Sequence, residues 1–147
     1  MNFLQKLFGK SNLETGKTDI KNPKYAKTHN KQAIHFITKE KFDEAIAECN
    51  KAIELNPNYA DAFCNRGLAY AKKNEFNHAI EDLSKAIELN PQLIEAHFNK
   101  AMIHEKAGQS QDAITEYKNF LKFAAGQNPM IIERAKIRIQ ELEQKNT

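Results

Sequence analysis

The heptapeptide KAIELNP occupies Lys51–Pro57 and returns unchanged at Lys85–Pro91, starting 34 residues later. When the chain is aligned with itself at that spacing, residues 26–59 and 60–93 agree at 12 of 34 positions. Residues 60–93 and 94–127 agree at five positions, and NFLKFAA stands where a third heptapeptide would fall. A period of this length predicts an array of three repeats, the third of them diverged.

Each repeat has the periodicity of two short helices. In the middle unit Phe63, Gly67 and Tyr70 lie three or four residues apart, as they would on one helix face. A second apolar stripe follows in residues 76–89, and Asn90–Pro91 ends it because proline disfavours a helical residue before it. Since one such hairpin cannot cover its own stripe, stacked neighbours must do so, which predicts an all-α fold. Four charged side chains are expected on the solvent side of the second stripe: Glu81, Asp82, Lys85 and Glu88.

A further helix is predicted after the third repeat, in residues 128–147. Gly126 is suited to end the preceding helix, Asn128 to be the N-cap and Pro129 to be the first helical residue. Phe120, which replaces an alanine of the repeat, is expected to fill the space against this helix. The helix then covers the end of the array with an apolar face: Ile132, Ala135, Ile139 and Leu142.

Charge is distributed unevenly along the chain. Residues 1–31 hold seven lysines against two acidic residues, whereas residues 32–147 carry a net charge of −2, so a nucleic-acid partner is not expected. No apolar run approaches the roughly 18 residues that span a bilayer, and the N-terminus lacks the apolar core of a secretory signal. A soluble, cytoplasmic protein is expected, with Cys49 and Cys64 reduced.

The N-terminal segment, residues 1–25, allows three interpretations. Phe3, Leu4, Leu7 and Phe8 form a short apolar patch, followed by a polar, lysine-containing stretch. The segment is a tail without fixed structure, a helix that covers the first hairpin, or a helix that docks on a membrane surface or a partner through residues 1–10.

The repeat resembles the tetratricopeptide repeat family. Its 34-residue pattern of aromatic, small, aromatic, alanine, large apolar, alanine and proline positions is met by Phe63, Gly67, Tyr70, Ala79, Leu83, Ala86 and Pro91. The first unit departs from that pattern at His29 and Cys49. The third departs at His97, His104, Ser110, Phe120 and Ala125. The resemblance implies a right-handed array of three hairpins and a C-terminal capping helix that binds peptides or protein surfaces without catalysis.

No motif in the sequence predicts an active site, a cofactor or a metal. The stretch Ser11–Thr18 approaches a phosphate-binding loop, but it lacks the first glycine and a preceding strand, and Asn22–Pro23 would break a helix after it. The histidines are expected to fill aromatic packing positions near a solvated edge, because no close pair with a third ligand exists. Cys49 is expected in the core, whereas Cys64 is expected to be exposed but has no adjacent base.

The remaining candidate site is the face of each first helix that points away from its own hairpin. In stacked arrays these faces line a concave groove. Asn65 and Asn99 hold equivalent positions one repeat apart, and because an amide both donates and accepts hydrogen bonds, the two can bind the backbone of an extended peptide. An ordinary solvated helix face is the alternative. The predicted lining is Lys27, Asn30, Lys31, Ile34 and Thr38, then Asp61, Cys64, Asn65, Leu68 and Lys72, then Glu95, Phe98, Asn99, Met102 and Lys106.

The resemblance adds two expectations about this groove. In several members of the family, asparagine at this position contacts the bound peptide backbone, so replacing Asn65 and Asn99 by alanine should weaken a ligand without lowering stability. Members that bind the C-terminal carboxylate of heat-shock chaperones use a clamp of basic and amide residues. Asn65 matches that clamp, but its other positions hold Asn30, Ile34, Glu95 and Asn99. A chaperone adaptor of this type is therefore not expected.

The leading prediction is a non-catalytic scaffold or adaptor that binds a peptide or protein segment in the groove, over an apolar floor of Ile34, Leu68, Phe98 and Met102. The second prediction is a self-associating unit, in which the exposed first hairpin stacks on another copy.

Overall fold

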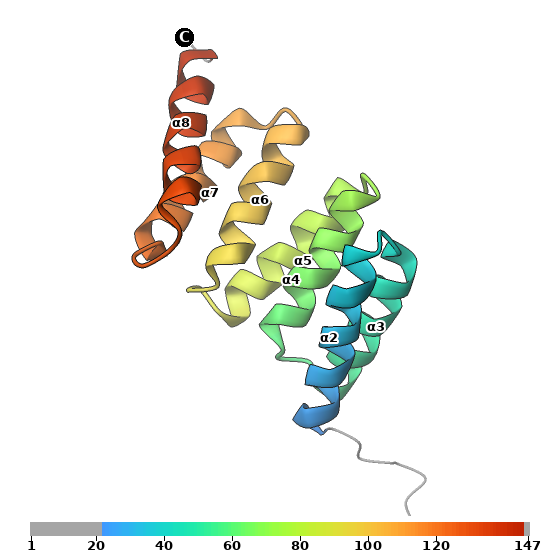
Figure 1. The fold of residues 1–147 in the computed structure, drawn as a ribbon. Coiled ribbons are helices and arrows are strands. Elements are labelled where there is room, and N and C mark those ends of the chain that lie inside the picture. The colour runs from blue at the N-terminus through green and yellow to red at the C-terminus, as the bar shows by residue number, and fades with distance from the viewer. Residues whose placement is uncertain (1–21, 146–147) are drawn as a thin grey trace, which may run out of the picture.

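The computed structural model describes residues 22–145, and this part of the chain contains seven helices and no strand. The apolar patch of residues 3–8 and the loop-like stretch of residues 11–18 lie outside the described residues. The helices are α2 (Pro23–Thr38), α3 (Phe42–Leu55), α4 (Ala60–Lys72), α5 (Phe76–Leu89), α6 (Ile94–Lys106), α7 (Ser110–Phe123) and α8 (Pro129–Lys145) (Figure 1).

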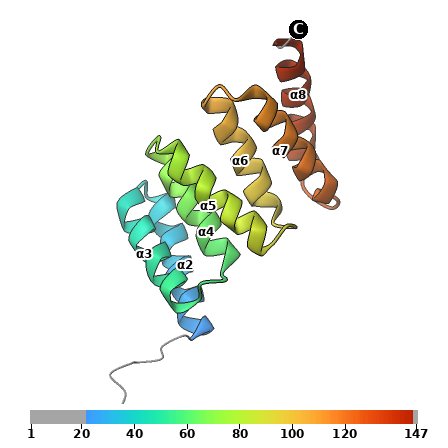
Figure 2. The same ribbon diagram turned by 180° about the vertical axis from the view of Figure 1, so that it is seen from behind.

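Consecutive helices form three antiparallel hairpins, α2–α3, α4–α5 and α6–α7, which stack in chain order (Figures 1 and 2). The first helices α2, α4 and α6 also contact one another across the repeats, and α8 packs on α7 at the end of the stack. The predicted all-α array of three hairpins and a terminal helix is therefore confirmed. It places α2, α4 and α6 side by side on one face of the molecule.

The turn inside each hairpin contains one residue with a positive φ at the same repeat position. Glu40, Asn74 and Gly108 have φ angles of 58°, 63° and 75°. Only glycine adopts this left-handed region without steric cost, so the first two hairpins hold a residue with a Cβ where the third holds the unstrained choice.

The repeated heptapeptide ends the second helix of a hairpin and starts the turn to the next repeat. Ala86, like its counterpart Ala52, has no exposed surface. Asn90 is extended at the end of α5, and its side-chain Oδ1 accepts a hydrogen bond from the backbone N–H of Gln92 at 3.2 Å. Asn56 makes the same contact in the first repeat. The asparagine therefore shapes the turn, besides preceding the proline that stops the helix.

Gly67 lies where α4 approaches α5 most closely. A Cβ built on it would lie 3.0 Å from Leu83 Cγ and 3.1 Å from the carbonyl oxygen of Ala79. The backbone oxygen cannot move aside, so the small residue that the sequence predicts at this helix contact is required by the packing.

The first and the last described helices, α2 and α8, each begin with a side-chain cap. Asn22 Oδ1 accepts from the backbone N–H of Lys24 at 3.0 Å, and Pro23 is the first residue of α2, so this pair begins a helix three residues before the predicted repeat boundary. Asn128 caps α8 in the same way through Met130 N–H at 2.9 Å, as predicted. Phe120 is buried against the apolar face of α8, which consists of Ile132, Ala135, Ile139 and Leu142.

Candidate functional site

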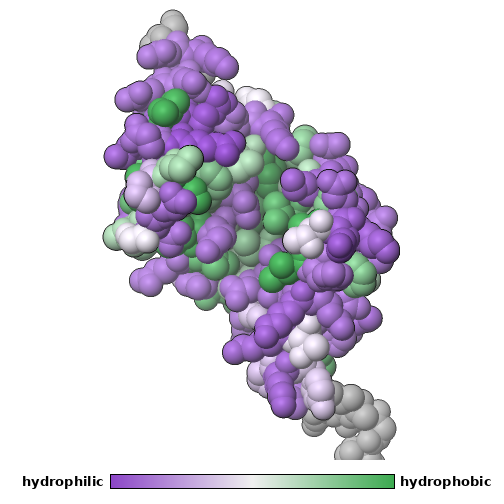
Figure 3. Space-filling model, viewed as in Figure 1, coloured by the Kyte–Doolittle hydropathy of each residue, from purple (hydrophilic) through white to green (hydrophobic). Residues whose placement is uncertain are grey.

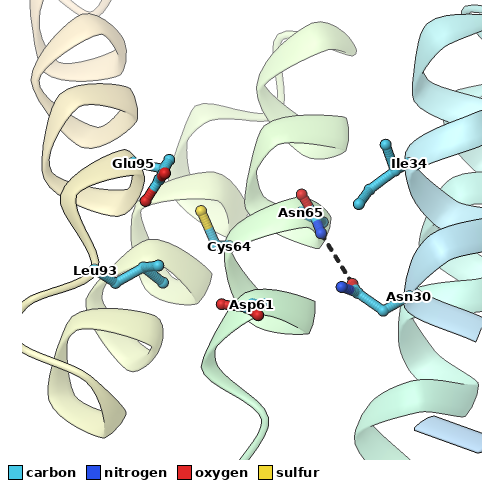
Figure 4. Close-up of a pocket in the computed structure, with 7 residues that line it drawn as sticks. All are labelled: Asn30, Ile34, Asp61, Cys64, Asn65, Leu93 and Glu95. Atoms are coloured by element: carbon cyan, nitrogen blue, oxygen red, sulfur yellow. Dashed lines mark hydrogen bonds between the residues drawn. The ribbon is translucent and has the colours of Figure 1, made fainter. Parts of the chain in front are cut away.

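A cavity of about 250 Å³ opens on the face formed by α2, α4 and α6. It lies between the beginnings of α4 and α6 and the middle of α2, so three repeats contribute to it (Figure 4). Leu93, which ends the loop before α6, lines it although the sequence did not single it out. The other lining residues are all among those predicted for the groove: Asn30, Ile34, Asp61, Cys64, Asn65 and Glu95.

An amide pair crosses this cavity from one repeat to the next. Asn65 Nδ2 donates to Asn30 Oδ1 at 2.9 Å, and Asn30 Nδ2 donates to the Tyr59 hydroxyl at 3.4 Å (Figure 4). Asn30 is only 4% exposed, so it acts as a buried support for Asn65. Asn65 is half-buried, and no donor within residues 22–145 contacts its Oδ1, which leaves this oxygen as an acceptor. Replacing Asn65 would therefore also remove an internal hydrogen bond, contrary to the expectation that this change leaves stability intact.

A second, smaller cavity of about 60 Å³ lies between the later turns of α4 and α6. Leu68 and Met102 line it with Asn99, whose amide Nδ2 lies 3.9 Å from Cys64 Sγ. Hydrophobic surface gathers in the middle of this face and hydrophilic side chains surround it (Figure 3). The remaining lining is Ala71, Lys72, Ile103 and Lys106.

The groove surface continues from α6 to α8. A third cavity of about 330 Å³ is lined by Met102 and Lys106 together with Arg134 and Arg138 of the terminal helix. Neither arginine is part of the apolar face predicted for α8, and only the fold shows that they border the groove. Glu105 and Tyr117 complete the lining.

The structure brings some predicted residues together and separates others. Lys27, Lys31 and Thr38 are exposed on α2 and line none of these three cavities. Phe98 turns toward α7, where its ring centroid lies 5.7 Å from Tyr117 and 5.1 Å from Phe120, so it belongs to the hairpin core. The other three residues predicted for the apolar floor, Ile34, Leu68 and Met102, line the cavities.

The prediction that Cys64 is exposed is wrong. Cys64 is 6% exposed and lies in the core cluster between α4 and α6, and Cys49 is fully buried as predicted. Burial raises the pKa of each thiol to about 12. Both side chains are thus neutral thiols near neutral pH, which is the inert form of cysteine.

A feature that the sequence reasoning missed is a carboxylate in each hairpin that is almost completely enclosed. Glu48, Asp82 and Glu116 lie 34 residues apart, with side chains 12%, 10% and 12% exposed. Asp82, which was expected on the solvent side, accepts two hydrogen bonds from Arg66, each at 2.7 Å. Arg66 also donates to Asn50 in the preceding repeat at 2.7 Å, which ties two hairpins together. The recurrence of an acidic residue at this spacing is the signal that could have shown it.

The other two carboxylates, Glu48 and Glu116, each contact a histidine. Glu116 accepts from Lys100 Nζ at 3.0 Å and contacts His97 Nδ1 at 2.9 Å, while His97 Nε2 faces the Pro91 carbonyl oxygen at 2.9 Å. Burial alone would raise the pKa of Glu116. Its hydrogen bonds with His97 and Lys100 have the larger opposite effect, so the pKa lies below the ordinary value. His97 stacks on Phe123 with ring centroids 6.0 Å apart, in line with the predicted aromatic packing. It is only 5% exposed, so the predicted solvated edge is wrong for this histidine.

The described residues contain no group of three or more histidine, cysteine, aspartate or glutamate side chains able to hold a metal ion. Within the same residues, no helix is both long and apolar enough to cross a membrane.

Stacked helical hairpins whose first helices line a common groove define the helical-repeat class of proteins. Family models described as tetratricopeptide repeat match residues 60–93 and 83–115, and one described as TPR repeat matches residues 36–74. The chain belongs to the tetratricopeptide repeat family. No curated protein gives a significant match to its sequence.

Solved structures of tetratricopeptide domains share the fold. The Arabidopsis OM64 TPR domain is 20% identical, with a TM-score of 0.75 over 84% of this chain and 98% of that one. The first TPR of Spaghetti (RPAP3) bound to the HSP90 peptide SRMEEVD is 20% identical, with a TM-score of 0.76 over 84% and 94%. The TPR2B domain of yeast Sti1 in complex with an Hsp70 peptide is 23% identical, with a TM-score of 0.76 over 82% and 98%.

Proposed function

We propose that this protein is a non-catalytic scaffold or adaptor that binds a peptide or protein segment along the groove of α2, α4 and α6. The observation that carries the proposal is the cavity at which three repeats meet, lined by a preorganised amide. Because the buried amide of Asn30 fixes Asn65, little conformational entropy is lost when Asn65 accepts a hydrogen bond from a ligand backbone.

The structural neighbours support a peptide ligand, but the sequence of this chain does not favour the chaperone peptides that they bind. Two of them were solved with HSP90 or Hsp70 peptides. At the clamp positions of chaperone-binding members this chain has Asn30, Ile34, Glu95 and Asn99, which offer no cation for a terminal carboxylate. The proposed partner is therefore a different segment.

A random peptide display library, presented to the immobilised full-length protein, tests the proposal. The groove variant combines Ile34→Ala with Asn99→Ala, because neither side chain makes a strong internal contact. The control combines Ile137→Ala with Asn77→Ala, which removes the same atoms outside the groove; Ile34 and Ile137 are both 45% exposed. We expect peptides to be retained by the wild type and the control and released by the groove variant. Retention that is equal on all three proteins would contradict the groove assignment.

Self-association is a second candidate, and exposed apolar side chains on α8 favour it. Met130, Ile131 and Ile137 are 78%, 40% and 45% exposed. A second copy covering them would give a mass that rises with concentration in sedimentation equilibrium and falls back to the monomer in the Met130→Ser, Ile137→Ser variant. A concentration-independent monomer mass would exclude it.

A further inference from the structure

One wall of the groove presents hydrogen-bond acceptors and negative charge. Asp61 and Glu95 lie in the first turns of α4 and α6, are exposed, and line the same cavity around Cys64 (Figure 4). Within residues 22–145 neither carboxylate has an ion pair or a hydrogen bond. The amide of Asn65 adds a third acceptor, since its Nδ2 is engaged by Asn30 and its Oδ1 is not.

Asp61 and Glu95 differ in this respect from the three enclosed carboxylates of the same molecule. Glu48, Asp82 and Glu116 each lie against a basic side chain. Two unpaired carboxylates in one concave cavity reinforce each other's field, because the low-dielectric walls of a cleft focus it. Such a cavity attracts a cation and repels an anion.

The shape of the lining suits a long basic side chain. Ile34 and Leu93 supply apolar surface at the same cavity as the carboxylates. A lysine or arginine side chain can lay its methylene stem on such surface while its head group donates several hydrogen bonds to acceptors. A terminal carboxylate would instead meet acceptors only.

The charge of the groove changes away from this wall. On α2 the position equivalent to Asp61 is Lys27, and the far ends of α4 and α6 carry Lys72 and Lys106 beside the small apolar cavity. The acidic wall is therefore local to the beginnings of α4 and α6. A ligand must place its cation there and an uncharged apolar side chain farther along the same two helices.

We propose, building on the peptide-binding function above, that the bound segment belongs to a partner protein and presents a lysine or arginine side chain to Asp61 and Glu95. An apolar side chain of the same segment enters the cavity between Leu68 and Met102.

The same random peptide display library, presented to the immobilised full-length protein, tests this specificity. The acidic-wall variant combines Asp61→Asn with Glu95→Gln. Its control combines Asp112→Asn with Glu81→Gln, which removes two exposed carboxylates from second helices. Asp112, like Asp61, lies in the first turn of its helix, so the effect of the Asp61 change on the helix dipole is matched. The retained peptides are sequenced, synthesised with blocked termini and titrated in low and high salt.

We expect lysine and arginine to be enriched among retained peptides. Their affinity should fall about three- to tenfold in the acidic-wall variant, as for two partly exposed charge pairs, and should weaken with added salt. The control should bind as the wild type does. Retained peptides without basic enrichment, or with equal affinity for both variants, would overturn this inference and leave the groove function standing. If no peptide is retained at all, both proposals fail.

A synthetic peptide of residues 1–21, which contains four lysines, is titrated alongside. If it binds the groove more tightly than every retained peptide, the occupant is this chain's own segment and the external partner is refuted. Weaker binding than the retained peptides supports the external partner.

Discussion

Replacing Glu116 by glutamine should destabilise the third hairpin in a way that depends on pH. The carboxylate is 12% exposed, and its two neighbours His97 and Lys100 have side chains that are 6% and 17% exposed. Removing one partner from a well-buried ion pair costs about 3–5 kcal/mol. Glutamine retains an acceptor oxygen for one neighbour and the site touches solvent, so we expect a loss of about 2 kcal/mol, or a Tm lower by about 4–8 °C.

The pH dependence follows from the lowered pKa of Glu116. Its ordinary value is 4.5, and the folded protein holds it lower because hydrogen bonds from His97 and Lys100 outweigh burial. A carboxylate with a lowered pKa in the folded state contributes stability that is fully present above the ordinary value. That contribution is lost as the pH falls through the folded value. The stability difference between wild type and Glu116→Gln should therefore shrink as the pH is lowered from neutral to below 4.5.

Urea unfolding followed by circular dichroism, repeated over this pH range, measures the difference. Glu81→Gln is the control, because Glu81 is an exposed carboxylate without an ion pair or hydrogen bond among the described residues. Its unfolding should match that of the wild type. The reasoning is refuted if Glu116→Gln unfolds like the control, or if its deficit is the same at both ends of the range.

Three further predictions concern other parts of the fold. Cys49 and Cys64 should resist iodoacetamide in the folded protein and react readily in urea, because burial raises both thiol pKa values to about 12; rapid native labelling would contradict the burial. Glu40→Gly should raise the free energy of unfolding by about 0.5–1 kcal/mol, since Glu40 has a φ of 58°; an unchanged or lower urea midpoint would show that this turn is not strained. Asn65→Ala should cost about 1 kcal/mol by removing the hydrogen bond to its buried amide partner, and Asn99→Ala, whose contact is a weak one to sulfur, should cost less than half of that; equal Tm values would argue against this difference.

The fold was predictable because the same pattern of helix contacts and helix ends recurs in each repeat. Small residues such as Gly67 mark close helix contacts, and Asn–Pro marks the end of a second helix. The terminal helix was predictable for the same reason, since Asn128 and Pro129 are local signals that act within a few residues. These features depend on short-range geometry, which sequence spacing describes well.

The site was less predictable because it depends on contacts between repeats. The spacing placed Asn30 and Asn65 on the groove face but could not show that one amide supports the other across 35 residues. Nor could it show that Phe98 turns into its own hairpin, or that Cys64 lies beneath the neighbouring helix. A helix face indicates which residues are near one another, whereas the crossing of the helices decides which of them remain exposed.

The repeat therefore separates two kinds of information in this chain. Some positions where the copies agree, such as Ala52 and Ala86, are fully buried and serve the stacking of helices. The third copy loses this alanine because its neighbour is α8, and Phe120 fills the wider space. At one exposed position of the first helices the copies differ in charge, with Lys27 in the first copy, Asp61 in the second and Glu95 in the third. Such differences change the groove without changing the array, which is why specificity is best sought where the repeats disagree.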